Sequence, residues 1–300
     1  MLTKPTLSEE KINGFLVNSL PKAGTHLVQK ALRLMPGVRF TGITLGYSSR
    51  RKGNLLDRMV SLLGLRAVDR WLKELGRPSS ISRADQGTLS LGVVSPRDVR
   101  EDLLRRILDF IHQQGFATSH MMYSDQTAAL LEERHMKMIL VLRDPRDVVI
   151  SQANYIPGQS GHFLHKLYQD LSFDERVLLS IQGKPGRFLS ICSRMDGIIP
   201  WLDKEYVHPV RFEDLVGPEG GGSRSSQLAA LKGMSDFLDL DLSRDTIEAI
   251  AGSLFGGTET FRRGRAGAWR EAFNADHVQA FKTSCSQTLI RLGYEEDDHW

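Results

Sequence analysis

The chain has 300 residues, of which 39 are Lys or Arg and 36 are Asp or Glu, giving a net charge of +3. That small excess excludes a surface built to coat nucleic acid or another polyanion. Hydrophobic residues at 41% and charged residues at 25% are ordinary for a folded, water-soluble chain.

The cysteine content and the short apolar runs exclude several further classes of protein. Cys192 and Cys285 are too few for a disulfide scaffold or a four-ligand zinc site, so a reducing compartment is the simpler expectation. Apolar runs such as 138–142 are far shorter than the ~20 residues of a membrane-spanning helix. The N-terminus lacks the apolar core of a secretory signal. We expect a cytoplasmic protein with neither a membrane nor a nucleic-acid partner.

Short apolar runs alternate with amphipathic helical stretches, which predicts a parallel α/β sheet flanked by helices. A strand is predicted at 14–18, followed by a helix that Pro36-Gly37 ends. Ser95 and Pro96 have the character of a helix start, so the next helix is predicted from there to Gly115. Further strands are predicted at 116–119, 137–142 and 207–212, and further helices at 124–135, after Asp144, and at 187–202, 227–238, 244–254 and 276–292.

Two stretches interrupt this alternation. Residues 47–86, with a helical portion predicted at 55–75, are expected to form an insertion over the sheet, either a substrate lid or a plain structural excursion. Residues 217–226, GPEGGGSRSS, have the composition of a flexible loop. No repeat or domain boundary is visible, so one domain over residues 1–300 is expected.

The first candidate binding element is the loop PKAGT at residues 21–25, between a strand and a helix. Gly24 at a helix start lets backbone N–H groups approach an anion, and Lys22 and Thr25 add a positive charge and a hydroxyl. The loop is not a Walker A motif, because its lysine precedes the glycine and Asn18 stands where the first glycine should be. The alternative is an ordinary strand-to-helix turn with a solvated lysine.

Two further basic motifs follow. Arg143 ends a predicted buried strand, and Ser151 lies on the same helix face as Asp147, an arrangement that suits a phosphate. The alternative is that Arg143 only pairs with Asp144 or Asp147. The arginine-rich stretch FRRGRAGAWR at 261–270 has the character of an anion-gripping loop, or else of a solvated surface run.

A histidine, His120, directly follows the predicted strand 116–119. A lone histidine is more often structural than catalytic. However, Lys22, His120, Arg143 and Phe212 each follow a predicted strand, at the edge where open α/β sheets bind ligands. We therefore expect one shared site.

Taken in order, these motifs resemble those of the cytosolic-type sulfotransferases that use 3′-phosphoadenosine 5′-phosphosulfate (PAPS), in particular bacterial-like small-molecule members. PKAGT is similar to the family's 5′-phosphosulfate loop, and Arg143 with Ser151 eight residues on matches its 3′-phosphate motif. Thr118-Ser119-His120 stands where the family has its catalytic histidine, and residues 261–269 match its R-K-G-x-x-G-x-W loop. The resemblance implies a three-layer, P-loop-like α/β fold with a central parallel sheet.

The same resemblance implies roles for individual residues. His120 would take the proton of an acceptor hydroxyl, and Lys22 would neutralise charge on the leaving 5′-phosphate. Transfer would be in line, with no metal required. The residues implied to bind PAPS are Lys22, Ala23, Gly24, Thr25, His26, Leu27, Arg143, Ser151, Phe212, Ser253, Phe255, Arg262, Arg263 and Gly264.

Some positions depart from the family pattern and leave questions open. Leu27 replaces a tryptophan that stacks on adenine, and Phe212 replaces a tyrosine. The family's dimer motif is not kept, so a monomer or a dimer of another kind is expected. The acceptor is expected to be a small molecule such as an alkaloid, phenol or lipid alcohol. The alternatives are a nucleotide-dependent small-molecule kinase, a carbohydrate sulfotransferase and a non-catalytic binding module.

Overall fold

The computed structural model describes residues 13–46, 87–255 and 265–300. The insertion expected at 47–86 and the predicted donor-binding residues Arg262, Arg263 and Gly264 lie outside the described residues.

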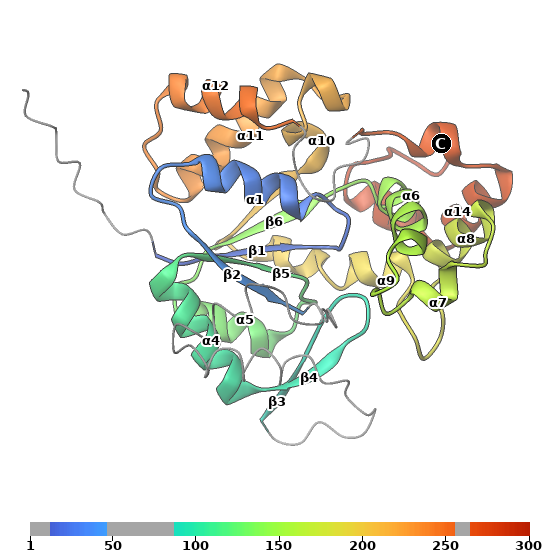
Figure 1. Cartoon of the computed structure of the whole chain (residues 1–300), viewed down its shortest axis with the longest axis horizontal. Helices are drawn as coiled ribbons and strands as arrows, with labels where there is room; N and C mark the ends of the chain where they lie inside the picture. The colour runs from blue at the N-terminus through green and yellow to red at the C-terminus, as the bar shows by residue number, and fades with distance from the viewer. Residues whose placement is uncertain (1–12, 47–86, 256–264) are drawn as a thin grey trace, which may run out of the picture.

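A five-stranded parallel sheet forms the centre of the fold, in the order β2-β5-β1-β6-β7 (Figure 1). β1 (Leu16–Ser19) lies between β5 (Phe116–Ser119) and β6 (Met138–Leu142), and β2 (Phe40–Leu45) and β7 (Val207–Arg211) form the edges. Four of these strands confirm the sequence predictions. β2 was not predicted, because it follows Pro36-Gly37 without the continuous apolar run of a central strand.

Helices cover both faces of the sheet, which confirms the three-layer α/β class (Figure 1). Successive side chains of β6 alternate between two apolar cores: Met138, Leu140 and Leu142 join one, and Ile139 and Val141 join the other. The second core contains α1 (Thr25–Leu34), α11 (Arg224–Phe237) and α12 (Arg244–Ser253). The first contains α4 (Glu101–Gln114), α5 (Asp125–Glu132), α6 (Pro145–Tyr155), α8 (Phe173–Gln182), α9 (Ile191–Asp196) and α14 (Ala275–Arg291).

The predicted helix start at Ser95-Pro96 is wrong. β3 (Thr88–Leu91) and β4 (Arg97–Arg100) form a two-stranded antiparallel sheet, and α4 begins only at Glu101. Leu89 pairs with Val99, and both are buried in the core on which α4 packs. Packing between the two strands therefore overrides the local signal for a helix cap.

Two other predicted boundaries are corrected. The helix predicted at 187–202 is two short helices, α9 and the 3₁₀ helix Ile199–Asp203, because Ser190 caps α9 and Gly197 ends it. The loop predicted at 217–226 contains the 3₁₀ turn Pro218–Gly220 and the start of α11, which is capped by Ser223.

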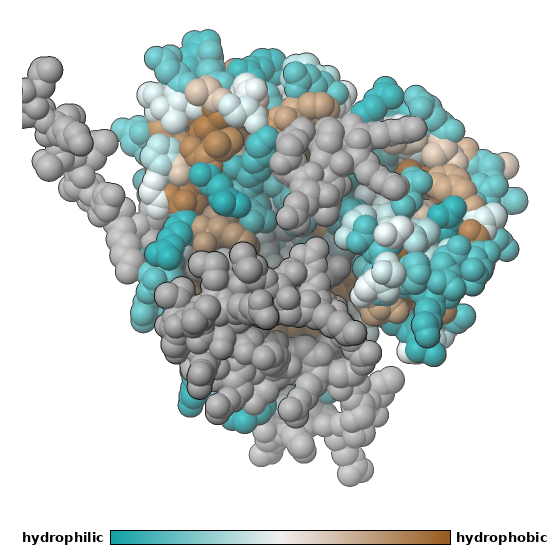
Figure 2. Space-filling view, in the orientation of Figure 1, coloured by the Kyte–Doolittle hydropathy of each residue, from teal (hydrophilic) through white to brown (hydrophobic). Residues whose placement is uncertain are grey.

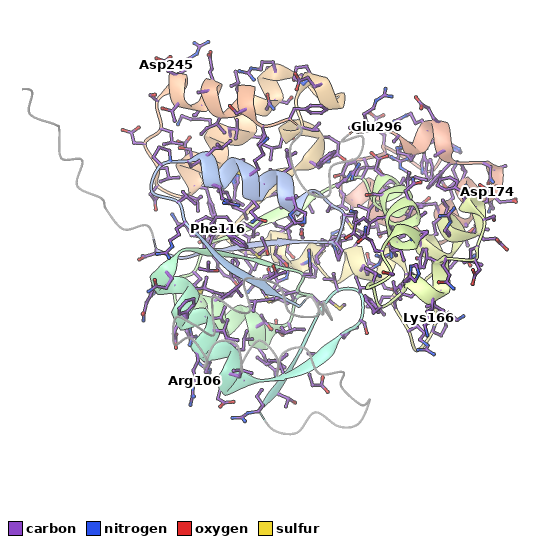
Figure 3. The ribbon with its side chains drawn as sticks, viewed as in Figure 1. Arg106, Phe116, Lys166, Asp174, Asp245 and Glu296 are labelled. Carbon is purple, nitrogen blue, oxygen red and sulfur yellow. The ribbon has the colours of Figure 1, made fainter. Side chains whose placement is uncertain are left out.

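The surface is mainly polar, with charged side chains at the periphery of the molecule and Phe116 inside it (Figure 3). On the face in Figure 2, hydrophobic residues gather between α1 and α12, near the apolar core that these helices share. Leu34, at the end of α1, is 41% exposed, and Phe163 is 45% exposed. No helix within the described ranges has the length and hydropathy needed to cross a membrane.

Asn18 ties the ends of β1 and β5 together. Its side chain is fully buried, donates to the Met121 carbonyl at 2.9 Å and accepts from the Met121 amide at 2.8 Å. The Ser119 hydroxyl donates to the same Asn18 oxygen at 3.0 Å. Because Ser119 and Met121 flank His120, these three hydrogen bonds fix the position of that histidine against β1.

Replacing Asn18 should therefore destabilise the fold strongly. Asn18→Ala leaves the Met121 amide without its partner in a buried site, and we expect a loss of about 2–4 kcal/mol in the free energy of unfolding. Urea denaturation measures it. The matched control is Ser119→Ala, which removes one of the three bonds and should cost about 1 kcal/mol. Equal losses for the two variants would contradict a clamping role for Asn18.

Candidate active site

Four of the predicted site residues meet at one edge of the sheet. Lys22 follows β1, His120 follows β5, and Arg143 and Phe212 follow β6 and β7. Since these strands are parallel, their carboxyl ends lie at the same edge, where open α/β sheets bind ligands.

The loop from β1 to α1 has a backbone that few sequences can adopt. Lys22 has a φ of 74° and Gly24 a φ of 106°, both in the left-handed region. A Cβ atom at Gly24 would also lie 2.6 Å from the Phe212 ring, so glycine is required twice over. The first turn of α1 contains no acidic residue, and the positive end of its dipole faces the loop.

The rest of the predicted loop residues are placed as follows. The Thr25 hydroxyl is within 2.6 Å of the Ser19 hydroxyl, at the start of α1. Ala23 is buried, His26 is exposed and Leu27 packs partly against the core shared by α1 and α12. The loop thus presents a cation, a hydroxyl and a helix N-terminus side by side, a combination that suits a phosphate or sulfate group.

His120 is held with a defined tautomer. Its Nδ1 lies 2.8 Å from the Ser19 carbonyl oxygen, which can only accept, so Nδ1 carries the proton and Nε2 has the lone pair. The Ser19 hydroxyl is 3.3 Å from the same nitrogen. Burial, with a smaller contribution from the nearby His26, lowers the pKa of His120 to about 4. The imidazole is therefore neutral at physiological pH.

Arg143 bridges two loops. Its guanidinium donates to the Lys22 carbonyl at 3.0 Å and to the Arg265 carbonyl at 3.1 Å, and it lies 4.2 Å from the Phe212 ring centroid. The ion pair with Asp147 is long, at 3.9 Å, so this pairing does not account for the side chain. Its buried Nε has no hydrogen-bond partner in the part of the chain that the structure describes. Such a donor suits an anion.

Asp147 anchors the end of the arginine-rich stretch, from Arg265 onward. Its carboxylate accepts from the Gly267 amide at 2.7 Å and from the Trp269 amide at 2.9 Å. The Ala266 amide also donates to the Gly220 carbonyl at 2.9 Å. The start of α6 and the loop after α10 (Phe212–Leu215) therefore both hold the segment from Arg265 onward beside Arg143.

A second buried arginine supports the same region. The Arg146 guanidinium makes an ion pair with Asp144 at 2.8 Å and another with Glu295. It also contacts two indole rings, 3.8 Å from the centroid of Trp269 and 4.5 Å from that of Trp300. The C-terminal residues thus brace the loop that carries Arg143.

Behind Arg143 lies a carboxyl group that the sequence did not single out. Glu213 accepts from the Asp144 amide at 2.8 Å and from the Tyr294 hydroxyl at 3.4 Å. Burial raises the pKa of Glu213 to about 7. At neutral pH this group is therefore partly protonated, which leaves more of the Arg143 charge uncompensated.

An aromatic cluster lies on the other side of Lys22. The Lys22 ammonium is 3.6 Å from the ring centroid of Tyr155, at the end of α6. His162 makes an edge contact with Tyr155 and stacks on Phe163, with centroids 6.3 and 5.0 Å apart. Burial, together with the positive charge of Lys22, lowers the pKa of His162 to about 4. This wall is neutral and aromatic next to the Lys22 cation.

Three other predicted donor-binding residues are not part of the contacts described above around Lys22, His120 and Arg143. The Ser151 hydroxyl, on α6, makes no hydrogen bond to any residue that the structure describes. Ser253 ends α12 and is exposed, while Phe255 is half-buried two residues later.

The sequence analysis did not identify Asn18, His162 and Glu213 as parts of the site. Within the described ranges no group of three or more His, Cys, Asp or Glu side chains is placed to hold a metal ion.

Comparison with known proteins identifies the family. The family model described as "Sulfotransferase domain" matches residues 13–252. Mouse sulfotransferase SULT7A1, in complex with PAP, has a TM-score of 0.56 at 14% identity, covering 93% of this chain and 84% of that chain. Retinol dehydratase, in a complex with retinol and PAP, has a TM-score of 0.54 at 17% identity, covering 92% and 80%. The curated proteins contain no match.

At these identities the structural likeness establishes the α/β fold alone. The match to the family model establishes the family, because it spans most of the chain. It includes the ends of all five parallel strands, where Lys22, His120 and Arg143 lie. The chain belongs to the sulfotransferase family.

Proposed function

We propose that this sulfotransferase moves the sulfuryl group of PAPS onto a hydroxyl group of a small-molecule acceptor and releases 3′,5′-adenosine bisphosphate. The observation that carries the proposal is the Arg143 guanidinium, whose buried Nε has no partner among the described residues. PAPS differs from other adenine nucleotide donors by its 3′-phosphate, and an arginine with an uncommitted donor fits that group.

The residues around the sheet edge fit the two ends of PAPS. Lys22, Thr25 and the N-terminus of α1 would hold the 5′-phosphosulfate. Arg143 would hold the 3′-phosphate, together with the predicted Arg262, Arg263 and Gly264. The segment after Gly264 is fastened to Arg143 and Asp147, which supports that assignment. The Phe212 ring lies beside the residues proposed for both ends of PAPS, because it packs next to Gly24 and under Arg143.

The chemistry follows from the placement of His120 and Lys22. Nε2 of neutral His120 accepts the proton of the acceptor hydroxyl while the hydroxyl oxygen forms a bond to sulfur. The bond between sulfur and the 5′-phosphate oxygen breaks, and the electron pair stays on that oxygen. The Lys22 ammonium stabilises the charge that develops there. The products are a sulfate ester, adenosine bisphosphate and a proton.

The acceptor proposed is a neutral ring-bearing alcohol or phenol. The wall of Tyr155, His162 and Phe163 supports this, since Phe163 is 45% exposed and stacks on His162, which in turn contacts Tyr155. The retinol and androsterone named for the retinol dehydratase structures are alcohols of this kind. An acceptor panel should therefore contain phenols, a sterol, an alkaloid alcohol and a sugar. We further propose a monomer, or a dimer that does not use the family's motif.

The role of His120 is tested by His120→Asn. The asparagine amide can still donate to the Ser19 carbonyl, so the fold is preserved, but the base is gone. We expect kcat to fall by about 10²–10⁴-fold with binding of the bisphosphate unchanged. The comparison variant is His299→Asn, at an exposed histidine near the C-terminus, which should keep kcat. Turnover close to that of the unmodified enzyme in His120→Asn would remove the histidine from the mechanism.

The role of Arg143 is tested by Arg143→Lys, which keeps the charge but loses the planar set of donors. Affinity for 3′,5′-adenosine bisphosphate should fall roughly 10- to 100-fold, while affinity for adenosine 5′-phosphate, which lacks the 3′-phosphate, should hardly change. Isothermal titration calorimetry measures both, with the exposed Arg244→Lys as the control. An equal loss for the two nucleotides would mean that Arg143 is only structural.

The pH dependence follows from the lowered pKa of His120. Only the neutral imidazole accepts a proton, so lowering its pKa to about 4 extends activity toward acid pH. At saturating PAPS, kcat/KM for the acceptor should stay level from neutral pH to about pH 5 and fall below that. Circular dichroism at each pH separates this fall from unfolding. A fall centred near 6.5, the value of a solvated histidine, would contradict the buried state.

A further inference from the structure

The two cysteines of the chain lie next to each other, far apart in sequence. Cys192 is on α9 and Cys285 on α14, two helices that pack together in the described fold. The Cys192 sulfur lies 3.2 Å from the Thr288 hydroxyl, and Thr288 follows Cys285 by three residues, so Cys192 and Cys285 meet at the same face of α14. Both are free thiols. Neither is used by the proposed sulfuryl transfer.

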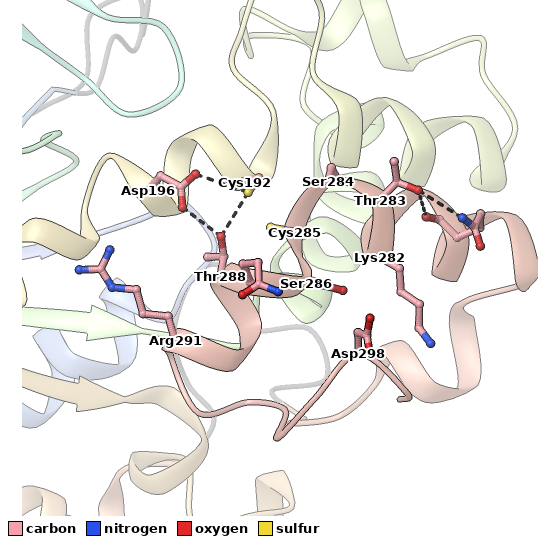
Figure 4. A pocket seen from close by; sticks show the side chains of 12 residues that line it. Cys192, Asp196, Lys282, Thr283, Ser284, Cys285, Ser286, Thr288, Arg291 and Asp298 are labelled. Carbon is pink, nitrogen blue, oxygen red and sulfur yellow. Dashed lines mark hydrogen bonds between the residues drawn. The ribbon is translucent and has the colours of Figure 1, made fainter.

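The pair lies beside a surface groove of about 710 Å³. Figure 4 shows the groove with Cys192, Cys285 and Thr288 together at one part of its wall, and Lys282, Arg291 and Asp298 among the other lining side chains. Cys192 is partly exposed there, whereas Cys285 is 2% exposed. A reagent that enters the groove therefore meets Cys192 first.

Polar neighbours hold the Cys192 thiol in place. Its sulfur lies 3.2 Å from the Thr288 hydroxyl and 3.5 Å from the Asp196 carboxylate, and the Thr288 hydroxyl donates to Asp196 at 3.0 Å (Figure 4). The hydrogen bond from Cys285 lowers the pKa of Cys192, against the opposing effects of burial and Asp196, while that of Cys285 is raised. Greater exposure and the lower pKa together make Cys192 the nucleophile of the pair, with Cys285 buried and protonated beside it.

We propose that Cys192 and Cys285 are a redox-active dithiol, which a low-molecular-weight disulfide such as oxidised glutathione converts to an internal disulfide joining α9 to α14. The Cys192 thiolate attacks one sulfur of the small disulfide, forms a mixed disulfide and releases one small thiolate. Cys285 then loses its proton, attacks the Cys192 sulfur and expels the second thiolate. Two protein thiols are oxidised, and one small disulfide is reduced to two thiols.

The order of events follows from charge as well as access. While Cys192 is a thiolate, its negative charge opposes ionisation of Cys285. Once Cys192 is in a mixed disulfide that charge is gone, and Cys285 ionises more readily next to the sulfur it must attack. The product closes a loop of about 90 residues, a length at which a disulfide restricts the unfolded chain strongly.

The experiment uses the purified full-length protein, reduced and then treated with oxidised glutathione under native conditions. Intact mass spectrometry should find a loss of two hydrogens and no adduct, and peptide mapping should find Cys192 joined to Cys285. Because the chain has two cysteines, an internal disulfide can only be this pair. The midpoint of thermal unfolding should rise, by roughly 5 °C or more, and return on reduction.

Two variants separate the steps. Cys285→Ser should stop at a single glutathione adduct, because the resolving thiol is absent. Cys192→Ser should form a glutathione adduct much more slowly than Cys285→Ser does, because Cys285 is shielded from the reagent. The proposal is overturned if the native protein keeps both thiols reduced, if non-reducing gels find crosslinked dimers instead, or if Cys192→Ser is modified as fast as Cys285→Ser. Unfolded protein, in which both thiols react, is the positive control.

Discussion

The geometry of the site depends on the hydrogen bonds of the Arg143 guanidinium, whose side chain is largely buried. A buried cation is costly unless polar groups compensate it, and here the compensation comes from carbonyl oxygens of two loops that are far apart in sequence. Lys22 follows β1 and Arg265 lies in the arginine-rich stretch, so this one side chain sets the distance between the two elements that we propose to bind the phosphates. The ring of Phe212 closes the third side. The parallel sheet makes this possible by bringing three strand ends to one edge.

In the proposed function, the PAPS donor and the acceptor would lie on opposite sides of that centre. On one side, Arg143 and the segment after Arg265 are braced by Asp147 and, through Arg146, by the C-terminal residues. On the other, Tyr155 and His162 form a neutral aromatic wall. Lys22 lies between the two, with its carbonyl held by Arg143 and its ammonium over Tyr155. A cation at the boundary is where charge develops when a sulfuryl group leaves a phosphate.

The sequence predicted the elements whose signal is local. The continuous apolar run of β6 and the start of α6 after Asp144 have signals within a few residues of the elements they define, and these predictions are confirmed. The hairpin of β3 and β4 was missed because the burial of Leu89 and Val99 outweighs a good helix-start signal at Ser95. The order of Lys22, His120 and Arg143 along the strand ends was also predictable, since parallel strands share an edge.

Other parts of the site had no signal in the sequence. Asn18 acts through residues about a hundred positions away, and nothing near it in sequence indicates that role. The contact of Lys22 with Tyr155 and the raised pKa of Glu213 both arise from burial between segments that are distant in the chain. Likewise, the position of His120 could be predicted, but the lowering of its pKa to about 4 arises from burial in the folded chain.

The central claim is that the edge of the sheet is built for an adenine nucleotide with a 3′-phosphate. The most direct test is calorimetric titration of the unmodified protein with 3′,5′-adenosine bisphosphate and, separately, with Mg-ATP. We expect tight binding of the bisphosphate and little or no heat from Mg-ATP. Preference for Mg-ATP, or no binding of either nucleotide, would contradict it.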